Sequence, residues 1–273
     1  MGNKIFNAPH LRCSQNMLLI NRELILSLIP LIITALLKYG LPSIRLMFFS
    51  VLSALLIESF ISIFKKQPLT IFDGTAIFTG LLIAFSLPVA VAFGIVFLTN
   101  LIAVGFVKNI FGGRNGCIFN QVAVAWLFMC LAFPLPMKAP IMVGCLFFAV
   151  ILGACWLFYK KIIDWKVPVS ILIAVVLTSF ISGQKVHFLL ADAGLFFAVV
   201  YLFTEYTSSP YTKIGRIIYG FTAGFLIVIV RNLTGMNASI FLVVVITNSL
   251  VPIFERIGVY LHLYVHKKIF SSI

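Results

Sequence analysis

The residues best suited to binding a ligand form a glycine- and asparagine-rich break, residues 108–120, between two apolar segments of membrane length. Gly112 and Gly113 allow close approach to the backbone, and Asn120 offers an amide. Unpaired backbone amides are costly in hydrocarbon, so a polar, irregular segment within the membrane must line a cavity or contact protein or ligand. The glycines suit an anion, although no Walker or dinucleotide spacing is present. Because a related break, residues 231–239, follows about 120 residues later, we predict an intramembrane binding site.

The sequence DGT at Asp73, Gly74 and Thr75 opens another strongly apolar segment. A carboxylate in such surroundings is costly and is by default a functional candidate. The same residues also suit the start of a helix, where aspartate accepts hydrogen bonds from the free amides of the first turn. Capping alone and ligand binding are therefore equal alternatives for this motif.

Residues 204–216, TEYTSSPYTKIGR, combine hydroxyl side chains with a proline stop and a Gly-Arg start to the next apolar segment. This composition is typical of a reentrant turn at the cytoplasmic side of a membrane. Ser208, Ser209 and Arg216 are its candidate binding residues. A plain connecting loop is the alternative.

Glu58, Asp192 and Glu205 are candidates for an ion pathway, because acidic side chains inside membranes are rare and usually functional. Glu58 lies well inside an apolar segment and suits a proton or cation ligand, with an interhelical hydrogen bond as the equal alternative. Asp192 shares the capping alternative. The four histidines have no heme-ligating arrangement, and no catalytic triad can be read. We therefore predict no metal site and no self-contained catalytic residues.

The composition is that of a polytopic membrane protein. Of the 273 residues, 62% are hydrophobic and only 10% are charged, whereas a soluble domain has about 25% charged residues. The mean hydropathy is +1.15. Ten apolar segments can be read, and at about 20 residues per span they leave no room for a soluble domain. The predicted fold class is all-α, with about ten transmembrane helices.

The basic residues indicate the orientation of these spans. With the N-terminus in the cytoplasm, fifteen of the 20 lysines and arginines fall in inside loops and tails, as the positive-inside rule requires. An even number of spans then returns the C-terminus to the cytoplasm. The net charge of +13 does not indicate a nucleic-acid partner, because the basic residues stand singly at the ends of apolar segments. Their distribution fits contact with a lipid bilayer.

The chain divides into two halves, residues 1–136 and 137–273, that look like divergent copies. Asp73 corresponds to Asp192, and each half later has a basic residue followed by asparagine, at separations of about 120 residues. Five spans per copy is an odd number, so the second copy is predicted to be inverted relative to the first. Such repeats place binding sites near the midplane, between interrupted helices.

Several motifs in the same order and spacing resemble one family: DGTAIFTGLLIAFSLP at residues 73–88, KNIFGGRNGCIFN at 108–120, TEYTSSPYTKIGRIIYG at 204–220 and NSLVPIFER at 248–256. The chain is similar to RnfD, a membrane component of the Rnf electron-transport complex, whose family includes the NqrB component of the sodium-translocating NADH:quinone reductase. The resemblance extends from about Ala8 to Arg256. It implies a ten-helix, two-repeat subunit that holds flavin and passes electrons within an ion-translocating oxidoreductase complex.

The chain also departs from this family. Members carry FMN esterified to a threonine in a long loop between the fifth and sixth spans, where this chain reads FPLPMKAP, residues 133–140, with no threonine and no insertion. Gln121 stands where the family favours proline, and Glu205-Tyr206 where it favours Asp-Pro. The expected cofactor is therefore flavin, FMN or riboflavin, bound without a covalent link.

The resemblance assigns the matched polar positions to the cofactor site, namely Asp73, Gly74, Thr75, Gly112, Gly113, Asn120, Ser208, Ser209 and Arg216. It implies other membrane subunits and an FMN-binding flavoprotein as partners, and the bacterial inner membrane as the location. Two alternatives stay open. Polar breaks in an inverted-repeat fold also suit a small-solute transporter or channel, and a member without redox function would be an assembly scaffold.

Overall fold

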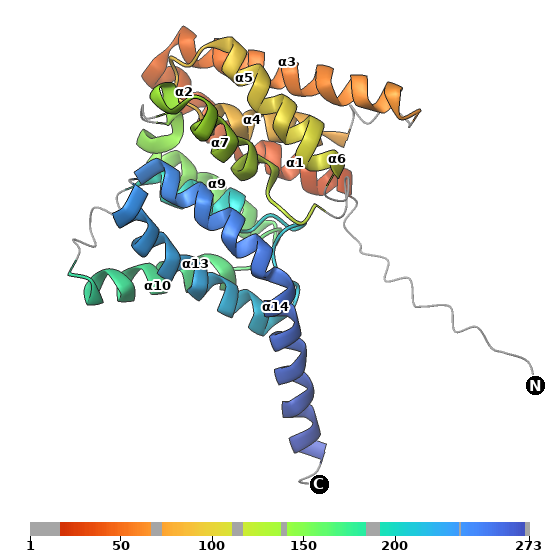
Figure 1. The fold of residues 1–273 in the computed structure, drawn as a ribbon, viewed down its shortest axis with the longest axis vertical. Coiled ribbons are helices and arrows are strands. Elements are labelled where there is room, and N and C mark those ends of the chain that lie inside the picture. The colour runs from red at the N-terminus through yellow and green to blue at the C-terminus, as the bar shows by residue number, and fades with distance from the viewer. Residues whose placement is uncertain are drawn as a thin grey trace, which may run out of the picture.

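A computed structural model describes residues 17–66, 73–110, 117–137, 141–183, 192–234 and 236–270 (Figure 1). Within these ranges the backbone is helical apart from short connections, and the extended pairing is limited to an isolated bridge between Pro88 and Ile141. The helices are α1 Met17–Ser27, α2 Ile29–Tyr39, α3 Leu41–Phe64, α4 Thr75–Ser86, α5 Phe93–Asn100, the π-helix η2 Leu101–Val107, α6 Lys108–Ile110, α7 Gln121–Ala132, α8 Pro134–Met137, the 3₁₀ turn η4 Met142–Cys145, α9 Phe147–Tyr159, α10 Lys166–Ile181, α12 Ala193–Phe197, the π-helix η5 Ala198–Leu202, α13 Lys213–Thr234 and α14 Met236–Phe270.

Ten apolar helical stretches make up most of the described chain. Five are long and apolar enough to cross a membrane: Leu18–Tyr39, Leu41–Phe64, Phe93–Ile110, Lys213–Leu233 and Ser239–Leu261. Five are shorter: Thr75–Ser86, Gln121–Ala132, Phe147–Tyr159, Lys166–Ile181 and Ala193–Leu202. Large side chains such as Leu131, Phe148 and Phe180 are more than 80% exposed, as expected where a surface faces lipid. The prediction of an all-α polytopic membrane protein is confirmed.

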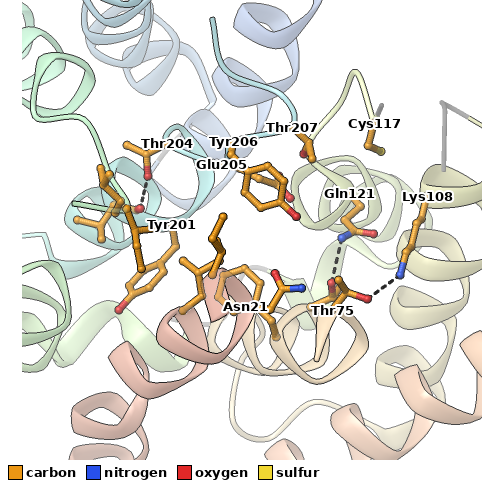
Figure 2. Close-up of a pocket in the computed structure, with 17 residues that line it drawn as sticks. Asn21, Thr75, Lys108, Cys117, Gln121, Tyr201, Thr204, Glu205, Tyr206 and Thr207 are labelled. Atoms are coloured by element: carbon orange, nitrogen blue, oxygen red, sulfur yellow. Dashed lines mark hydrogen bonds between the residues drawn. The ribbon is translucent and has the colours of Figure 1, made fainter. Parts of the chain in front are cut away.

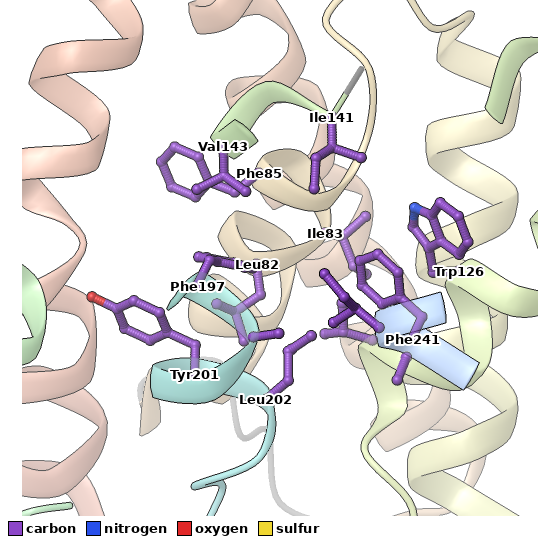
Figure 3. Packing of buried hydrophobic residues seen from close by; sticks show 14 of the residues in the cluster. Leu82, Ile83, Phe85, Trp126, Ile141, Val143, Phe197, Tyr201, Leu202 and Phe241 are labelled. Atoms are coloured by element: carbon purple, nitrogen blue, oxygen red, sulfur yellow. The ribbon is translucent and has the colours of Figure 1, made fainter. Parts of the chain in front are cut away.

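Two of the short helices form the centre of the molecule. Every residue of α4 from Phe78 to Ser86 is buried, and so is every residue from Phe197 to Phe203, along η5. Helices that are apolar on all sides belong in a protein interior. The rings of Phe85 and Phe197 meet there, with centroids 6.3 Å apart (Figure 3). Because 10 or 12 residues rise only about 15–18 Å, these helices end inside the bilayer rather than at its surface.

The two halves share one apolar core. The indole ring of Trp126 on α7 stacks on Phe241 of α14, with centroids 4.3 Å apart, and its N–H donates to the carbonyl of Ser86 at 2.9 Å. Between α1 and α2 the helix is interrupted, and the Tyr201 hydroxyl donates to the carbonyl of Ser27 at 3.0 Å. Aromatic side chains therefore fill the boundary between the halves, and the hydroxyl of Tyr201 also bonds a carbonyl on the opposite side of it.

The last helix extends beyond the other helices. Figure 1 shows the C-terminal part of α14 leaving the bundle. Pro252 lies inside this helix, and an interior proline removes one backbone hydrogen bond and favours a kink. The first part of α14 therefore packs in the core through residues such as Phe241, while its final turns project away from it.

Close packing of α13 on α10 gives a direct test of the fold. A Cβ at Gly224 would lie 2.6 Å from the Cβ of Ala174 and even nearer the carbonyl of Ile171, whereas a Cβ at Gly94 meets nothing within 4 Å. We predict that Gly224→Ala lowers the free energy of unfolding by about 1–3 kcal/mol, since overpacking forces the backbones apart. Thermal unfolding in detergent measures this. Gly94→Ala is the matched control and should be neutral or slightly stabilising, so equal losses in both variants would contradict the packing.

Candidate functional site

A partly open cavity lies between α1, α4, the start of α7 and residues 204–207 (Figure 2). Apolar side chains form much of its wall, including Leu24 and Phe78. Its polar groups come from segments far apart in the sequence, namely Asn21, Thr75, Thr79, Lys108, Cys117, Gln121, Tyr201, Thr204, Glu205, Tyr206 and Thr207. Three of the sequence motifs, at residues 73–88, 108–120 and 204–220, therefore meet at one place.

A chain of hydrogen bonds built on a buried ion pair closes one side of the cavity. Lys108 Nζ lies 2.8 Å from Glu58 Oε1 and donates to Thr75 Oγ1 at 3.0 Å. Thr75 donates its hydroxyl and its amide to Asp73 Oδ1, at 3.1 and 3.3 Å. Gly74 between them has a φ of +76°, a left-handed conformation that glycine adopts at little cost. Lys108 and Glu58 are only 8% and 5% exposed, so each charge depends on the other.

Glu205 and Asn120 form a second polar group at the cavity. Asn120 caps α7, because its Oδ1 accepts from the amide of Ala123 at 3.0 Å, and its Nδ2 donates to Glu205 Oε2 at 2.7 Å. Burial raises the pKa of Glu205 from its ordinary value of 4.5 to about 7, although hydrogen bonds from Thr207, Ser208 and Asn120 act in the opposite direction. This carboxyl group therefore changes its charge near neutral pH.

Gln121 presents an unused acceptor at the same cavity. Its Nε2 donates to Thr79 Oγ1 at 2.9 Å, and its Oε1 is buried without a hydrogen-bond partner among the described residues. Leaving a buried acceptor unpaired costs about 1–3 kcal/mol. A ligand that carries an N–H donor would remove this cost, so Gln121 is a candidate contact for such a ligand.

Most of the predicted site residues gather at this cavity. Thr75 and Glu205 line it, and residues that bond directly to lining side chains are Glu58, Asp73, Asn120 and Ser208. Ser209 and Arg216 lie instead at a neighbouring cavity. Gly112 and Gly113 lie outside the described residues.

Asp192 belongs to a different place in the molecule. It is the N-cap of α12, where its Oδ1 accepts from the amide of Gly194 at 2.9 Å. Its Oδ2 pairs with Arg231 Nη2 at 2.9 Å. The capping interpretation of Asp192 is confirmed, and this residue does not line the cavity. Its role in an ion pathway stays a prediction.

Several lining residues were not predicted from the sequence. Thr79 follows Thr75 by four residues and therefore shares its helical face, which is a signal that could have identified it. Asn21 is a polar residue near the start of an apolar helix, and it donates to the carbonyl of Asp73 at 2.9 Å. Tyr201 has no such signal, because its place at the cavity depends on how η5 packs.

The fold and the cavity define a polytopic all-α membrane protein with an internal polar site between short central helices. A model of the NQR2, RnfD, RnfE family matches residues 4–144 and 140–260, and the chain belongs to this family. It is 25% identical to the D-type subunit of the Na(+)-translocating ferredoxin:NAD(+) oxidoreductase complex of Acetobacterium woodii, over 92% of each chain. It is 31% identical to the D-type subunit of the ion-translocating oxidoreductase complex of Methanosarcina acetivorans, over 77% of this chain and 79% of the relative. The D-type subunit of the proton-translocating ferredoxin:NAD(+) oxidoreductase complex of Clostridium ljungdahlii is 23% identical, over 92% of this chain and 93% of the relative.

The buried ion pair provides a test of the site's architecture. We predict that Lys108→Met lowers the free energy of unfolding by about 3–5 kcal/mol, because it leaves the Glu58 carboxylate buried without its counter-charge. The double variant Lys108→Met, Glu58→Leu should recover most of this loss. Lys65→Met is the control, since exposed Lys65 bonds only to Asn109 in the described contacts. Chemical denaturation measures all four proteins, and a double variant as unstable as Lys108→Met would contradict the pairing.

The raised pKa of Glu205 predicts a protonation change near pH 7. The folded protein holds this proton more tightly than the unfolded chain. The resulting stabilisation is therefore fully present below about pH 4.5 and is lost as the pH rises through about 7. Infrared difference spectroscopy should show the C=O band of a protonated carboxyl disappearing over that upper range. Glu205→Gln should lack the band, and an unchanged titration in this variant would assign it to another group.

Proposed function

We propose that this protein is the D-type membrane subunit of an Rnf-like complex, a redox-driven ion-translocating oxidoreductase. The observation that carries the proposal is the convergence of three matched motifs on one cavity. Family membership supports it, as do relatives whose names describe ferredoxin:NAD(+) oxidoreductase complexes that translocate sodium ions or protons. In such a complex the chain acts with other membrane subunits rather than as an enzyme by itself.

The cavity is proposed to hold a flavin without a covalent bond. Its chemistry suits a ring with polar edges, because apolar side chains such as Phe78 and Leu24 line it together with hydrogen-bonding groups. The buried Oε1 of Gln121 offers an acceptor for a ring N–H. Thr75 and Thr79 add hydroxyl groups on one face of α4. A bound flavin would supply one- and two-electron transfer, which no side chain of this site provides.

The surrounding residues have distinct tasks under this proposal. The α4 wall and Phe78 exclude water, and the Lys108–Glu58 pair fixes Thr75 at the cavity edge. Glu205 can hold or release a proton at its carboxylate near neutral pH. A group that gains or loses a charge in a low-dielectric site changes the energy of any nearby charge. Glu205 is therefore placed to couple proton binding to the redox state of the cavity.

The segment between the fifth and sixth spans offers no threonine for the covalent attachment that the family resemblance implies. Residues 133–140 contain no threonine, and the described part of this segment forms the short helix α8. An FMN-binding flavoprotein is therefore proposed as the neighbouring redox partner. We place the complex in the bacterial inner membrane, with both termini of this chain in the cytoplasm, from the distribution of basic residues.

Two inverted repeats, residues 1–136 and 137–273, are proposed as the organisation of the chain. Support comes from equivalent polar contacts in each half. In the first half Lys108 reaches Asp73 through the hydroxyl of Thr75, and in the second half Arg231 reaches Asp192 directly. The two π-helices and the two fully buried helices also occur once in each half of the chain that the structure describes.

Purification of the protein with its membrane partners, followed by cofactor extraction, tests the function. We predict that wild-type protein retains flavin, and that Gln121→Leu and Thr79→Val each lower its affinity about three- to tenfold, the effect of losing one hydrogen bond. Thr222→Val is the control, because Thr222 bonds only within its own helix in the described contacts and does not line the cavity. Absorbance and fluorescence titrations measure the affinities.

Three other outcomes would count against the proposal. Flavin loss in Thr222→Val equal to that in Thr79→Val would remove the cavity as the site. Flavin-free protein that moves small solutes into liposomes would favour the transporter alternative. Flavin-free protein that still holds the complex together would identify a scaffold.

A further inference from the structure

A second, partly open cavity lies between the end of α9, the start of α10 and the segment that precedes α13. The helix α9 ends at Tyr159, α10 begins at Lys166 and α13 begins at Lys213. Because apolar membrane helices begin and end where hydrocarbon meets water, this cavity lies at the level of the lipid head groups. Ser209 and Arg216 line it, and the proposed flavin site makes no use of them.

Basic side chains give the second cavity an excess of positive charge. Lys161 and Arg216 line it together with Asp164. Both oxygens of Asp164 accept from Lys166 Nζ at 3.1 Å, and its Oδ2 also accepts from Arg216 Nη1 at 2.5 Å. The carboxylate is therefore already compensated by its own partners. Three basic groups against one carboxylate leave two positive charges in excess.

Several hydrogen-bond donors of the second cavity are available to an anion. Arg216 is held in place, because its Nε donates to the carbonyl of Pro210 at 2.8 Å and its Nη1 pairs with Asp164. A guanidinium has five donors in a planar fork, so these two bonds leave others for a ligand. The ammonium of Lys161 is exposed and has no partner in the described contacts, and the hydroxyl of Ser209 is almost buried. A fixed arginine, a mobile lysine and a hydroxyl suit a phosphate.

An apolar surface leads from the second cavity along the outside of α10. Phe158 and Trp165 line the cavity, and Trp165 is the first of four exposed side chains at intervals of four residues, followed by Val169, Ile173 and Leu177. This spacing places them along one face of the helix, and Figure 1 shows α10 at the edge of the bundle. An indole at head-group level is typical of membrane proteins. A soluble phosphate would leave the apolar face uncovered, whereas the acyl chains of a phospholipid would cover it.

We propose that the second cavity binds the phosphate of an anionic phospholipid, with Lys161 and Arg216 as its contacts and the acyl chains along the exposed face of α10. A zwitterionic lipid fits less well, because its own cation is repelled by the excess positive charge. The bound lipid joins the connection between α9 and α10 to the segment that precedes α13. This inference does not depend on flavin binding, since it concerns a different cavity.

Lys161 and Lys66 provide a matched pair of variants. Each is the second lysine of a Lys-Lys pair that follows an apolar helix, and each has a left-handed backbone, with φ of +56° and +53°. Lys161 lines the second cavity, whereas Lys66 lines neither cavity. Asparagine tolerates this conformation well. Lys161→Asn and Lys66→Asn therefore remove the same charge from the same backbone geometry.

The experiment titrates the delipidated full-length protein in detergent with phosphatidylglycerol and with phosphatidylcholine of the same acyl chains, and native mass spectrometry counts the bound lipids. We expect wild-type protein to bind the first phosphatidylglycerol about tenfold more tightly than phosphatidylcholine, as a charge-assisted hydrogen bond would produce. Lys161→Asn should lose most of this preference with phosphatidylcholine affinity unchanged, and Lys66→Asn should keep it. A higher ammonium acetate concentration should weaken the binding of phosphatidylglycerol more than that of phosphatidylcholine.

Three results would overturn the inference. Equal wild-type affinities for the two lipids would show that the cavity does not select an anionic head group. Equal losses in Lys161→Asn and Lys66→Asn would indicate general attraction to basic residues rather than a site. Displacement of phosphatidylglycerol by glycerol 3-phosphate at the same concentration would assign the cavity to a soluble phosphate, since the acyl chains would then add nothing.

Discussion

The structure depends on the cost of ending a helix inside hydrocarbon. The first amides of a helix have no partner within it, and a membrane offers them no water. α4 and the pair α12–η5 are too short to cross the bilayer and are buried along their length. Their ends must therefore be satisfied by the protein itself, which concentrates polar side chains at a few points in a core that is otherwise apolar.

Among the described residues, three helix starts inside the core each use a short polar side chain and a second group that holds it. Asp73 accepts from the amide of Thr75, Asn120 from that of Ala123, and Asp192 from that of Gly194. Asp73 is held by Lys108, which acts through the hydroxyl of Thr75. Asn120 is held by Glu205, and Asp192 by Arg231. Two of these assemblies adjoin the same cavity, because the start of α4 and the start of α7 lie next to the end of η5. The polar site thus follows from how the short helices are terminated.

The sequence predicts the parts of this arrangement that are local. Apolar segments, the DGT turn and the cap at Asp192 are all readable, because each depends on neighbouring residues. The contacts that build the cavity depend on packing between distant segments, as with Lys108 and Glu58, 50 residues apart. Both π-helices end beside the cavity, η2 at Lys108 and η5 ahead of Thr204. The extra residue in a π turn changes which side chains face inward. No pattern in these apolar sequences predicts the π turn.

Lys108 and Arg231 make different contacts, and the contacts of Lys108 place polar groups at the edge of the cavity. In the second half Arg231 pairs directly with Asp192, and α10 has no acidic residue that could compete for it. In the first half, Glu58 on α3 pairs with the amine of Lys108, and the hydroxyl of Thr75 links this amine to Asp73. Lys108 therefore takes part in a bridged contact at the cavity edge, whereas Arg231 and Asp192 form a direct ion pair away from it.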